Sequence, residues 1–194
     1  MIVAPKSKLL RQRQGDAPTI VQILPAMIRG GVERGTVEMA DAIQKHGGRA
    51  IVISRGGPMV RHLDRLGAKH YQLDVHTKNP FRWPQVRRRL KAILSRENAD
   101  LVHVRSRVPA WIALPAAAAL GIATVSTVHG RFTTLSTLKR IYNRKLLKTD
   151  HIIAISNYVK DLITSQYVDV EERLTVVHRG VDIDLFNPDN VNQT

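Results

Sequence analysis

The 194-residue sequence contains no cysteine, which excludes a disulfide framework and a thiolate metal site. Acidic residues are also scarce, with 16 Asp and Glu against 30 Lys and Arg, so the formal net charge is +14 at pH 7. Such a charge favours a negatively charged partner: a nucleic acid, an anionic membrane or a phosphorylated substrate. Composition alone does not choose among these three.

Long apolar runs and several common motifs are absent as well. The longest apolar stretch, residues 108–120, is interrupted by Pro109 and Pro115 and is shorter than the roughly 20 residues that a transmembrane helix needs. There is no P-loop lysine and no complete G-x-G-x-x-G, so the sequence lacks the main motifs of nucleoside triphosphatases and of dinucleotide-binding oxidoreductases. Histidines and acids do not occur at ligand spacing, and we expect neither a metal nor a cofactor.

Short apolar runs rich in β-branched residues recur along the chain, separated mostly by segments of helical length and period. The runs cover residues 20–24, 49–54, 71–75, 101–104, 123–128, 151–155 and 174–177. This alternation is typical of parallel sheets whose two faces are covered by helices. The sequence therefore predicts an α/β fold with a doubly wound, Rossmann-like parallel sheet.

Helix limits can be predicted where the stop and start signals are clear. Apolar residues at helical spacing predict helices over 32–46 and 84–97, and Gly47-Gly48 stops the first of them. The hydroxyl of Ser156 is expected to cap the helix that follows residue 155.

Small and basic residues follow several of the predicted strands. In an open parallel sheet, ligands bind where the carboxyl ends of the strands lead into loops. Two adjacent glycines at a helix start let backbone N–H groups approach an anion. The candidate site residues are Gly30, Gly31, Arg34, Arg105, Ser106, Arg107, His129, Gly130, Arg131 and Ser156.

Five ordered segments of the chain resemble one known family. They are GGVERGTVEMADAIQKHGG (30–48), ADLVHVRSRVPAWIA (99–113), STVHGRF (126–132), DHIIAISNYVKDLI (150–163) and LTVVHRGVDIDLFNP (174–188). In this order they are similar to the N-terminal domain of retaining glycosyltransferases of the GT-B fold, family four.

The resemblance implies one half of a GT-B fold, in an enzyme that transfers a sugar from a nucleotide-sugar donor to a glycan or lipid-linked acceptor with retention. The Lys and Arg residues near the start of the chain predict a basic flexible arm at 1–17, and the resemblance implies the Rossmann-like domain at 18–187 and the start of an interdomain linker at 188–194. The second, donor-binding domain is expected outside these residues, and we expect little transfer without it.

The resemblance also suggests roles for the candidate residues. His129 matches the active-site histidine that lies against the transferred sugar, and the other candidates would bind the donor phosphate or the acceptor. Arg179 stands where many relatives have asparagine, which leaves the role of this position open.

A basic stretch with two aromatic residues lies at the start of the second predicted helix. Its members are Phe81, Arg82, Trp83, Arg87, Arg88, Arg89, Lys91 and Arg96. Aromatic and cationic side chains together suit an anionic lipid surface. We therefore expect a cytoplasmic protein, peripheral on the cytoplasmic face of the inner membrane, near a lipid-linked or lipopolysaccharide-type acceptor. The alternative is a solvated basic helix without a target.

Two other functions compete with transfer. The chain alone would be a catalytically silent module that binds an acceptor or a membrane if no donor domain joins it. A basic nucleic-acid-binding protein ranks third, because no helix-turn-helix, RNP or zinc pattern is present, and nucleic acid is not expected as a partner.

Overall fold

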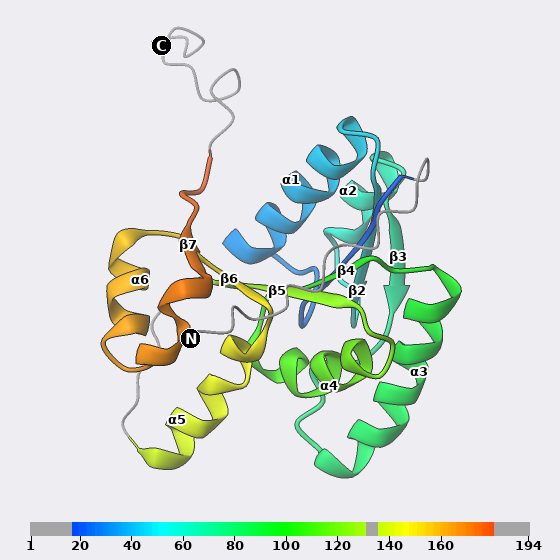
Figure 1. Ribbon diagram of the computed structural model, residues 1–194. Coiled ribbons are helices and arrows are strands. Elements are labelled where there is room, and N and C mark those ends of the chain that lie inside the picture. Colours follow the sequence, from blue (N-terminus) through cyan, green and yellow to red (C-terminus); the bar gives the residue numbers. More distant parts are fainter. Residues whose placement is uncertain (1–16, 131–135, 181–194) are drawn as a thin grey trace, which may run out of the picture.

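The computed structural model describes residues 17–130 and 136–180, so nearly all of the predicted arm, the predicted linker and Arg131 lie outside the described residues. The chain forms one parallel sheet in the order β3-β2-β1-β4-β5-β6-β7 (Figure 1). The strands are β1 (Thr19–Ile23), β2 (Arg49–Ser54), β3 (Lys69–Gln72), β4 (Leu101–Val104), β5 (Ala123–Val128), β6 (His151–Ala154) and β7 (Leu174–Val176). The order reverses between β1 and β4, as in doubly wound sheets, and the predicted fold class is confirmed.

Helices cover both faces of this sheet. They are α1 (Gly31–Lys45), α2 (Val60–Arg65), α3 (Trp83–Arg96), α4 (Arg107–Ala118), α5 (Thr137–Arg144) and α6 (Asn157–Thr164), with short 3-10 helices at Pro80–Arg82, Leu146–Lys148 and Val168–Arg173. Figure 1 shows α1 and α2 on one side of the sheet and α3 and α4 on the other.

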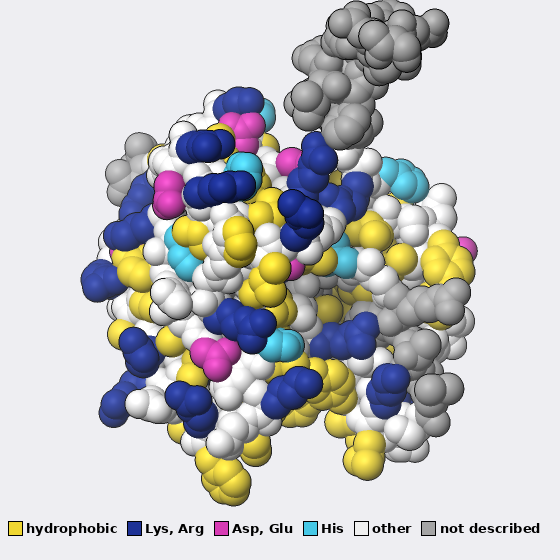
Figure 2. Space-filling model, turned by 180° about the vertical axis from the view of Figure 1, so that it is seen from behind, with side chains coloured by type: hydrophobic (Ala, Val, Ile, Leu, Met, Phe, Trp, Pro, Cys, Tyr) yellow, Lys and Arg dark blue, Asp and Glu magenta, His cyan; other side chains and the backbone are white. Residues whose placement is uncertain are grey.

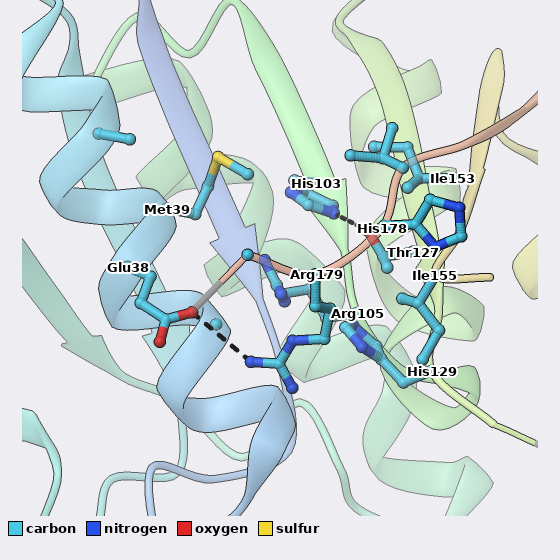
Figure 3. A pocket seen from close by; sticks show the side chains of 14 residues that line it. Glu38, Met39, His103, Arg105, Thr127, His129, Ile153, Ile155, His178 and Arg179 are labelled. Carbon is cyan, nitrogen blue, oxygen red and sulfur yellow. Dashed lines mark hydrogen bonds and ion pairs between the residues drawn. The ribbon is translucent and has the colours of Figure 1, made fainter. Parts of the chain in front are cut away.

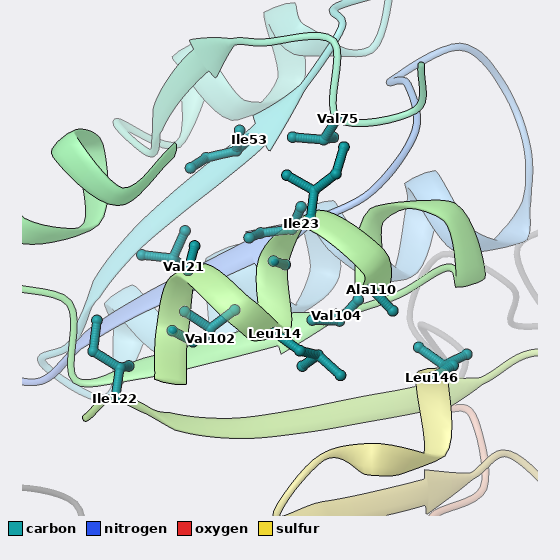
Figure 4. Close-up of a cluster of buried hydrophobic side chains, with 14 of the residues drawn as sticks. Val21, Ile23, Ile53, Val75, Val102, Val104, Ala110, Leu114, Ile122 and Leu146 are labelled. Carbon is teal, nitrogen blue, oxygen red and sulfur yellow. The ribbon is translucent and has the colours of Figure 1, made fainter. Parts of the chain in front are cut away.

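The larger core lies between the sheet and the α3–α4 layer. Val21 and Ile23 of β1 and Val102 and Val104 of β4 are fully buried in it, and Figure 4 shows them beneath α4. Val159 of α6 joins the same cluster. A second core packs α1 and α2 on the opposite face. Where helices cover both faces, the strand is a nearly unbroken apolar run, as in residues 50–53 of β2.

Most predicted limits agree with the structure, and one is wrong. Helix α1 ends before Gly47, whose φ of 77° is a left-handed conformation that glycine adopts readily. The third apolar run was predicted over 71–75, whereas the strand is Lys69–Gln72. Leu73 and Val75 are buried beyond the strand end: the Leu73 N–H still donates to the Ser54 carbonyl of β2 at 2.8 Å, and the Val75 N–H turns back to the Leu73 carbonyl.

One part of the sheet is left uncovered on the α1 face. Alternation along the strands turns Thr127, Ile153 and Val177 toward this face, while Ile152 and Ala154 turn toward the α6 side. Among the residues that the structure describes, no helix packs over β5, β6 and β7 on the α1 face. The uncovered strip becomes one wall of the cleft described below.

Candidate functional site

Two adjoining hollows of about 400 and 300 Å³ lie at the carboxyl edge of the sheet. They share Arg105, Thr127 and His129. The larger hollow lies between α1 and the uncovered strip, and Figure 3 shows its lining. The smaller hollow is bounded by Val32 at the start of α1, Ser106 before α4 and Tyr142 of α5, among others.

Strand geometry explains why these side chains converge. Gln22 of β1 lies beside His103 of β4 in the parallel ladder, and both point to the α1 face. Arg105 comes two residues after His103, and His129 two residues after Thr127, so both continue toward the same face just beyond the strand ends. The site is therefore built from the last residues of adjacent strands.

Arg105 is buried, with 6% of its surface exposed. Its Nη1 donates a hydrogen bond to Gln22 Oε1 at 2.9 Å, and Gln22 Nε2 donates to the carbonyl of Thr36 at 3.0 Å. Burial and then the nearby charge of Arg179 lower the pKa of Arg105 to about 10, while Glu38 acts in the opposite direction. The guanidinium still carries its proton at neutral pH.

Arg179 reaches the same place from beyond the end of β7. Its Nη2 pairs with Glu38 Oε2 at 3.5 Å (Figure 3), and Glu38 Oε1 also accepts a hydrogen bond from Arg34 Nε at 3.0 Å. A Cβ atom at Gly31 would lie 2.7 Å from Arg179 Nη1. The glycine at this position therefore lets the guanidinium lie directly against the first turn of α1.

Two histidines in the cleft are neutral at physiological pH. Burial, followed by the charges of Arg105 and Arg179, lowers the pKa of His129 to about 4. Burial, followed by the charge of Arg105, lowers the pKa of His103 to about 3. His103 Nε2 lies 2.7 Å from Thr127 Oγ1 in a hydrogen bond, whereas the buried His129 Nε2 has no hydrogen-bond partner among the described residues. His129 thus lies at the junction of the two hollows with a buried ring nitrogen that no described residue engages.

The structure brings most of the predicted site residues together. His129 and Arg105 line both hollows, and Ser106, Arg107 and Gly130 line the smaller one. Gly30 caps α1, Gly31 lies against Arg179, and Arg34 pairs with Glu38.

Ser156, which was also predicted, lines neither hollow. Ser156 Oγ accepts a hydrogen bond from the backbone N–H of Val159, which confirms the predicted cap, and its role toward a ligand stays a prediction. Arg131 lies outside the described residues.

Sequence reasoning missed the residues that belong to helix and strand interiors. These are Gln22, Glu38, Met39, His103, Thr127 and Ile153. Gln22 and His103 carry a visible signal, because each is a polar residue inside an otherwise apolar strand. Glu38 and Met39 carry none, since both look like ordinary exposed positions of α1.

No group of three or more His, Asp or Glu side chains suited to a metal ion occurs within residues 17–130 and 136–180. Nothing in the described cleft therefore calls for a metal ligand set, and the expectation of no metal or cofactor stays a prediction.

Comparison with known proteins adds the family. The family model for Glycosyltransferase Family 4 matches residues 29–185. The chain belongs to glycosyltransferase family 4. The family predicted from the sequence is therefore confirmed. A separate comparison with curated proteins found no match.

Solved structures give the same result for the fold. A glycosyltransferase from Rickettsia africae ESF-5 shares 36% sequence identity and a TM-score of 0.80, over 91% of this family 4 chain and 47% of the Rickettsia chain. Anabaena Alr3699/HepE in complex with UDP-glucose matches with a TM-score of 0.69 and 16% identity, over 88% and 47% of the two chains. The family 4 chain thus spans about half the length of these relatives. The predicted half of a GT-B fold is confirmed.

Proposed function

We propose that this family 4 domain is the acceptor-side half of a glycosyltransferase that moves a sugar from a nucleotide diphosphate donor to an acceptor. The observation that carries the proposal is the position of His129, a neutral, partly buried imidazole at the junction of two hollows beside the first turn of α1, whose Nε2 has no hydrogen-bond partner among the described residues. The UDP-glucose bound to the Anabaena protein supports a UDP-sugar as the donor.

The start of α1 provides the other element of the proposed donor site. Glycosyl transfer builds negative charge on the departing phosphate, and a helix N-terminus stabilises such charge through its N–H groups and dipole. A neutral His129 would hydrogen-bond a hydroxyl of the transferred sugar without adding charge. The donor nucleotide would be held mainly by a second domain opposite this edge, either in the same polypeptide or in another one.

The proposed stereochemistry is retention. Glu38 is the one carboxylate among the described lining residues of the two hollows, and it pairs with Arg34 and Arg179. With its pKa near 4, His129 is a poor base at neutral pH. The acceptor proton would therefore pass to the departing phosphate oxygen as the sugar–phosphate bond breaks and the acceptor–sugar bond forms on the same face.

The test of this function is a transfer assay over a panel of UDP-sugars. The chain is assayed alone and with a second domain supplied as the continuation of its own polypeptide or from the Rickettsia relative. We expect transfer only with the second domain present, and an α-linked product from an α-linked donor by NMR. His129→Ala should lower the rate about 100-fold or more, because a polar contact to the reacting group is lost.

His46→Ala is the matched control, since His46 is exposed just beyond the end of α1 and lines neither hollow. It should leave transfer unchanged. If His129→Ala keeps activity within a few-fold of the parent, His129 is not part of the mechanism. If no second domain restores transfer, the alternative holds, and the chain is a binding module without activity of its own.

We further propose that the acceptor is lipid-linked or lipopolysaccharide-type, and that the domain attaches to the cytoplasmic face of the inner membrane. Within the described part of the chain, no helix is long and apolar enough to cross a bilayer. Two apolar side chains project near the starts of α3 and α5: Phe81 is 92% exposed and Leu138 is 81% exposed. Ile141, one helical turn after Leu138, is also exposed.

A stack of three aromatic rings connects α3, next to Phe81, with α5, which carries Leu138. Trp83 of α3 lies 5.8 Å from Trp111 of α4, which lies 6.3 Å from Tyr142 of α5, measured between ring centroids. In Figure 1 the first turns of α3 and α5 lie at the same lower end of the molecule, and Figure 2 shows hydrophobic side chains projecting there among Lys and Arg. The arrangement supports attachment to an anionic lipid surface, with the smaller hollow beside it.

A further inference from the structure

Arg105 is a buried cation for which the described residues offer no dedicated counter-ion. Within residues 17–130 and 136–180, its one hydrogen bond is to the neutral amide of Gln22, its Nε has no partner, and no carboxylate lies within ion-pair distance. Glu38, the nearest acid, is engaged by Arg34 and Arg179. Burial of an uncompensated charge is unfavourable, so the position is best satisfied by an anion that comes from outside.

Arg179 supplies a second cation at the same point. The position that a Cβ atom of Gly35 would occupy lies 3.0 Å from Arg179 Nη2 and 3.1 Å from Arg105 Nη2. The two nitrogen atoms are therefore no more than about 6 Å apart. One phosphate or carboxylate group placed between them can accept a hydrogen bond from each guanidinium, and such charge-assisted bonds are the strong ones.

The rest of the larger hollow has a different character. Met39 and Ala42 of α1 face Ile153, Ile155 and Val177 of the uncovered strip. In a nucleoside diphosphate the polar ribose directly follows the phosphates, and the face of the more distant base is its one surface suited to this apolar wall. A ligand that matches both parts carries an anionic group on an apolar body.

We propose that the larger hollow binds the acceptor through an anionic group, of the alkyl phosphate type, held between Arg105 and Arg179, with the apolar body of the acceptor against Met39 and Ile153. This rests on the proposed function only in calling the ligand an acceptor. Gly35 is then a specificity-determining residue, because a side chain there would fill the point where the two guanidinium groups meet.

The test uses the chain as it is, without a donor or a second domain. Hexyl phosphate is the probe, compared with hexanol, inorganic phosphate and UDP by calorimetry. The ¹⁵N-labelled Arg105 Nε–Hε resonance gives a readout at the site itself. We expect hexyl phosphate to bind more tightly than inorganic phosphate, hexanol to show no binding, and hexyl phosphate to shift the Arg105 resonance.

Three variants separate a built site from general attraction to a basic protein. Arg179→Gln should weaken hexyl phosphate binding about tenfold or more, as expected for a lost charged hydrogen bond. Arg61→Gln removes the same charge from the exposed surface of α2 and should change the affinity less than twofold. Gly35→Ala keeps every charge and favours the helix, yet should also weaken binding about tenfold.

The proposal is overturned if Arg61→Gln weakens binding as much as Arg179→Gln, or if the Arg105 resonance does not move. It is also overturned if UDP shifts that resonance and hexyl phosphate does not, since the arginine pair would then serve the donor diphosphate. The two proposals can fail separately. If no transfer occurs even with a second domain supplied, but hexyl phosphate still shifts the Arg105 resonance, the proposed function is rejected and the anion site remains.

Discussion

His103 and His129 are held in the neutral form by burial between the sheet and α1, and the charge of Arg105 opposes protonation of both. In the unfolded chain each histidine binds a proton near pH 6.5. Between that pH and the lower pKa values of the folded state, the unfolded chain therefore binds more protons than the folded one. Stability contributed by the neutral rings is complete above pH 6.5 and is lost as the pH falls toward the folded-state pKa values, about 4 for His129 and about 3 for His103.

This gives a prediction for the free energy of unfolding. It should decrease as the pH is lowered from 6.5 to 5, and His103→Gln should flatten the slope by up to about 1.4 kcal/mol per pH unit, the value for one proton. Urea denaturation followed by circular dichroism at several pH values measures the slope. His46→Gln, which removes an exposed histidine, should leave it unchanged. An unchanged slope in the His103→Gln variant would show that His103 already carries its proton in the folded state.

Individual residues were predicted from the sequence only where a loop follows a strand. His129, Arg105 and Ser106 were found because they directly follow apolar runs, and the edge rule for parallel sheets collects such residues. Gln22 and Thr127 were missed because their role depends on whether their side chains point to the α1 face of the sheet. The sequence does not give this orientation, since it follows only once the strands and helices are assembled. Arg179 meets Gly31 and Gly35 from a segment more than 140 residues away, and no local pattern contains that contact.

Helix α5 shows how an element can differ from the usual surface helix. Its inner face carries Asn143, which is fully buried, and Tyr142, which stacks on Trp111 of α4. Its outer face carries two exposed apolar side chains, Leu138 and Ile141. Arg140 and Arg144 of the same helix engage Gln166 and Asp169. The sequence predicted a basic aromatic surface around α3 alone. Helix α5 was missed because its outward pair is recognisable only once the inward face is known.

The membrane proposal gives a prediction for these two elements. The double variant Phe81→Ser/Leu138→Ser should lose at least tenfold in affinity for vesicles that contain anionic lipid, because two side chains worth about 1.5 to 3 kcal/mol each on burial are removed. Sedimentation with anionic and with neutral vesicles at low salt measures the change.

Val168→Ser is the matched control, since Val168 is 85% exposed in the 3-10 helix that leads into β7, away from the starts of α3 and α5. It should leave vesicle binding as it was. Equal recovery with anionic and neutral vesicles would refute the attachment, as would equal losses in the double variant and the control.

The direction of the parallel strands determines where a ligand can bind in this domain. Seven parallel strands end at one edge, and helices α1, α4 and α6 all begin there. The apolar runs predicted this sheet well, since buried strands and helical periods are local signals. The uncovered strip over β5, β6 and β7 could not be predicted, because it follows from the way the helices divide between the two faces. That strip converts a closed core into a cleft with one apolar wall.

The proposed function requires the carboxyl edge of the sheet to be one wall of a glycosyl-transfer site, with the other wall in a second domain. The decisive measurement is a crystal structure of this domain joined to a second domain, with a UDP-sugar bound. We predict that the sugar ring lies within hydrogen-bonding distance of His129, that its diphosphate faces the first turn of α1, and that the larger hollow stays open for an acceptor. A donor bound on the α3–α4 side of the sheet, with His129 remote from the sugar, would contradict the claim.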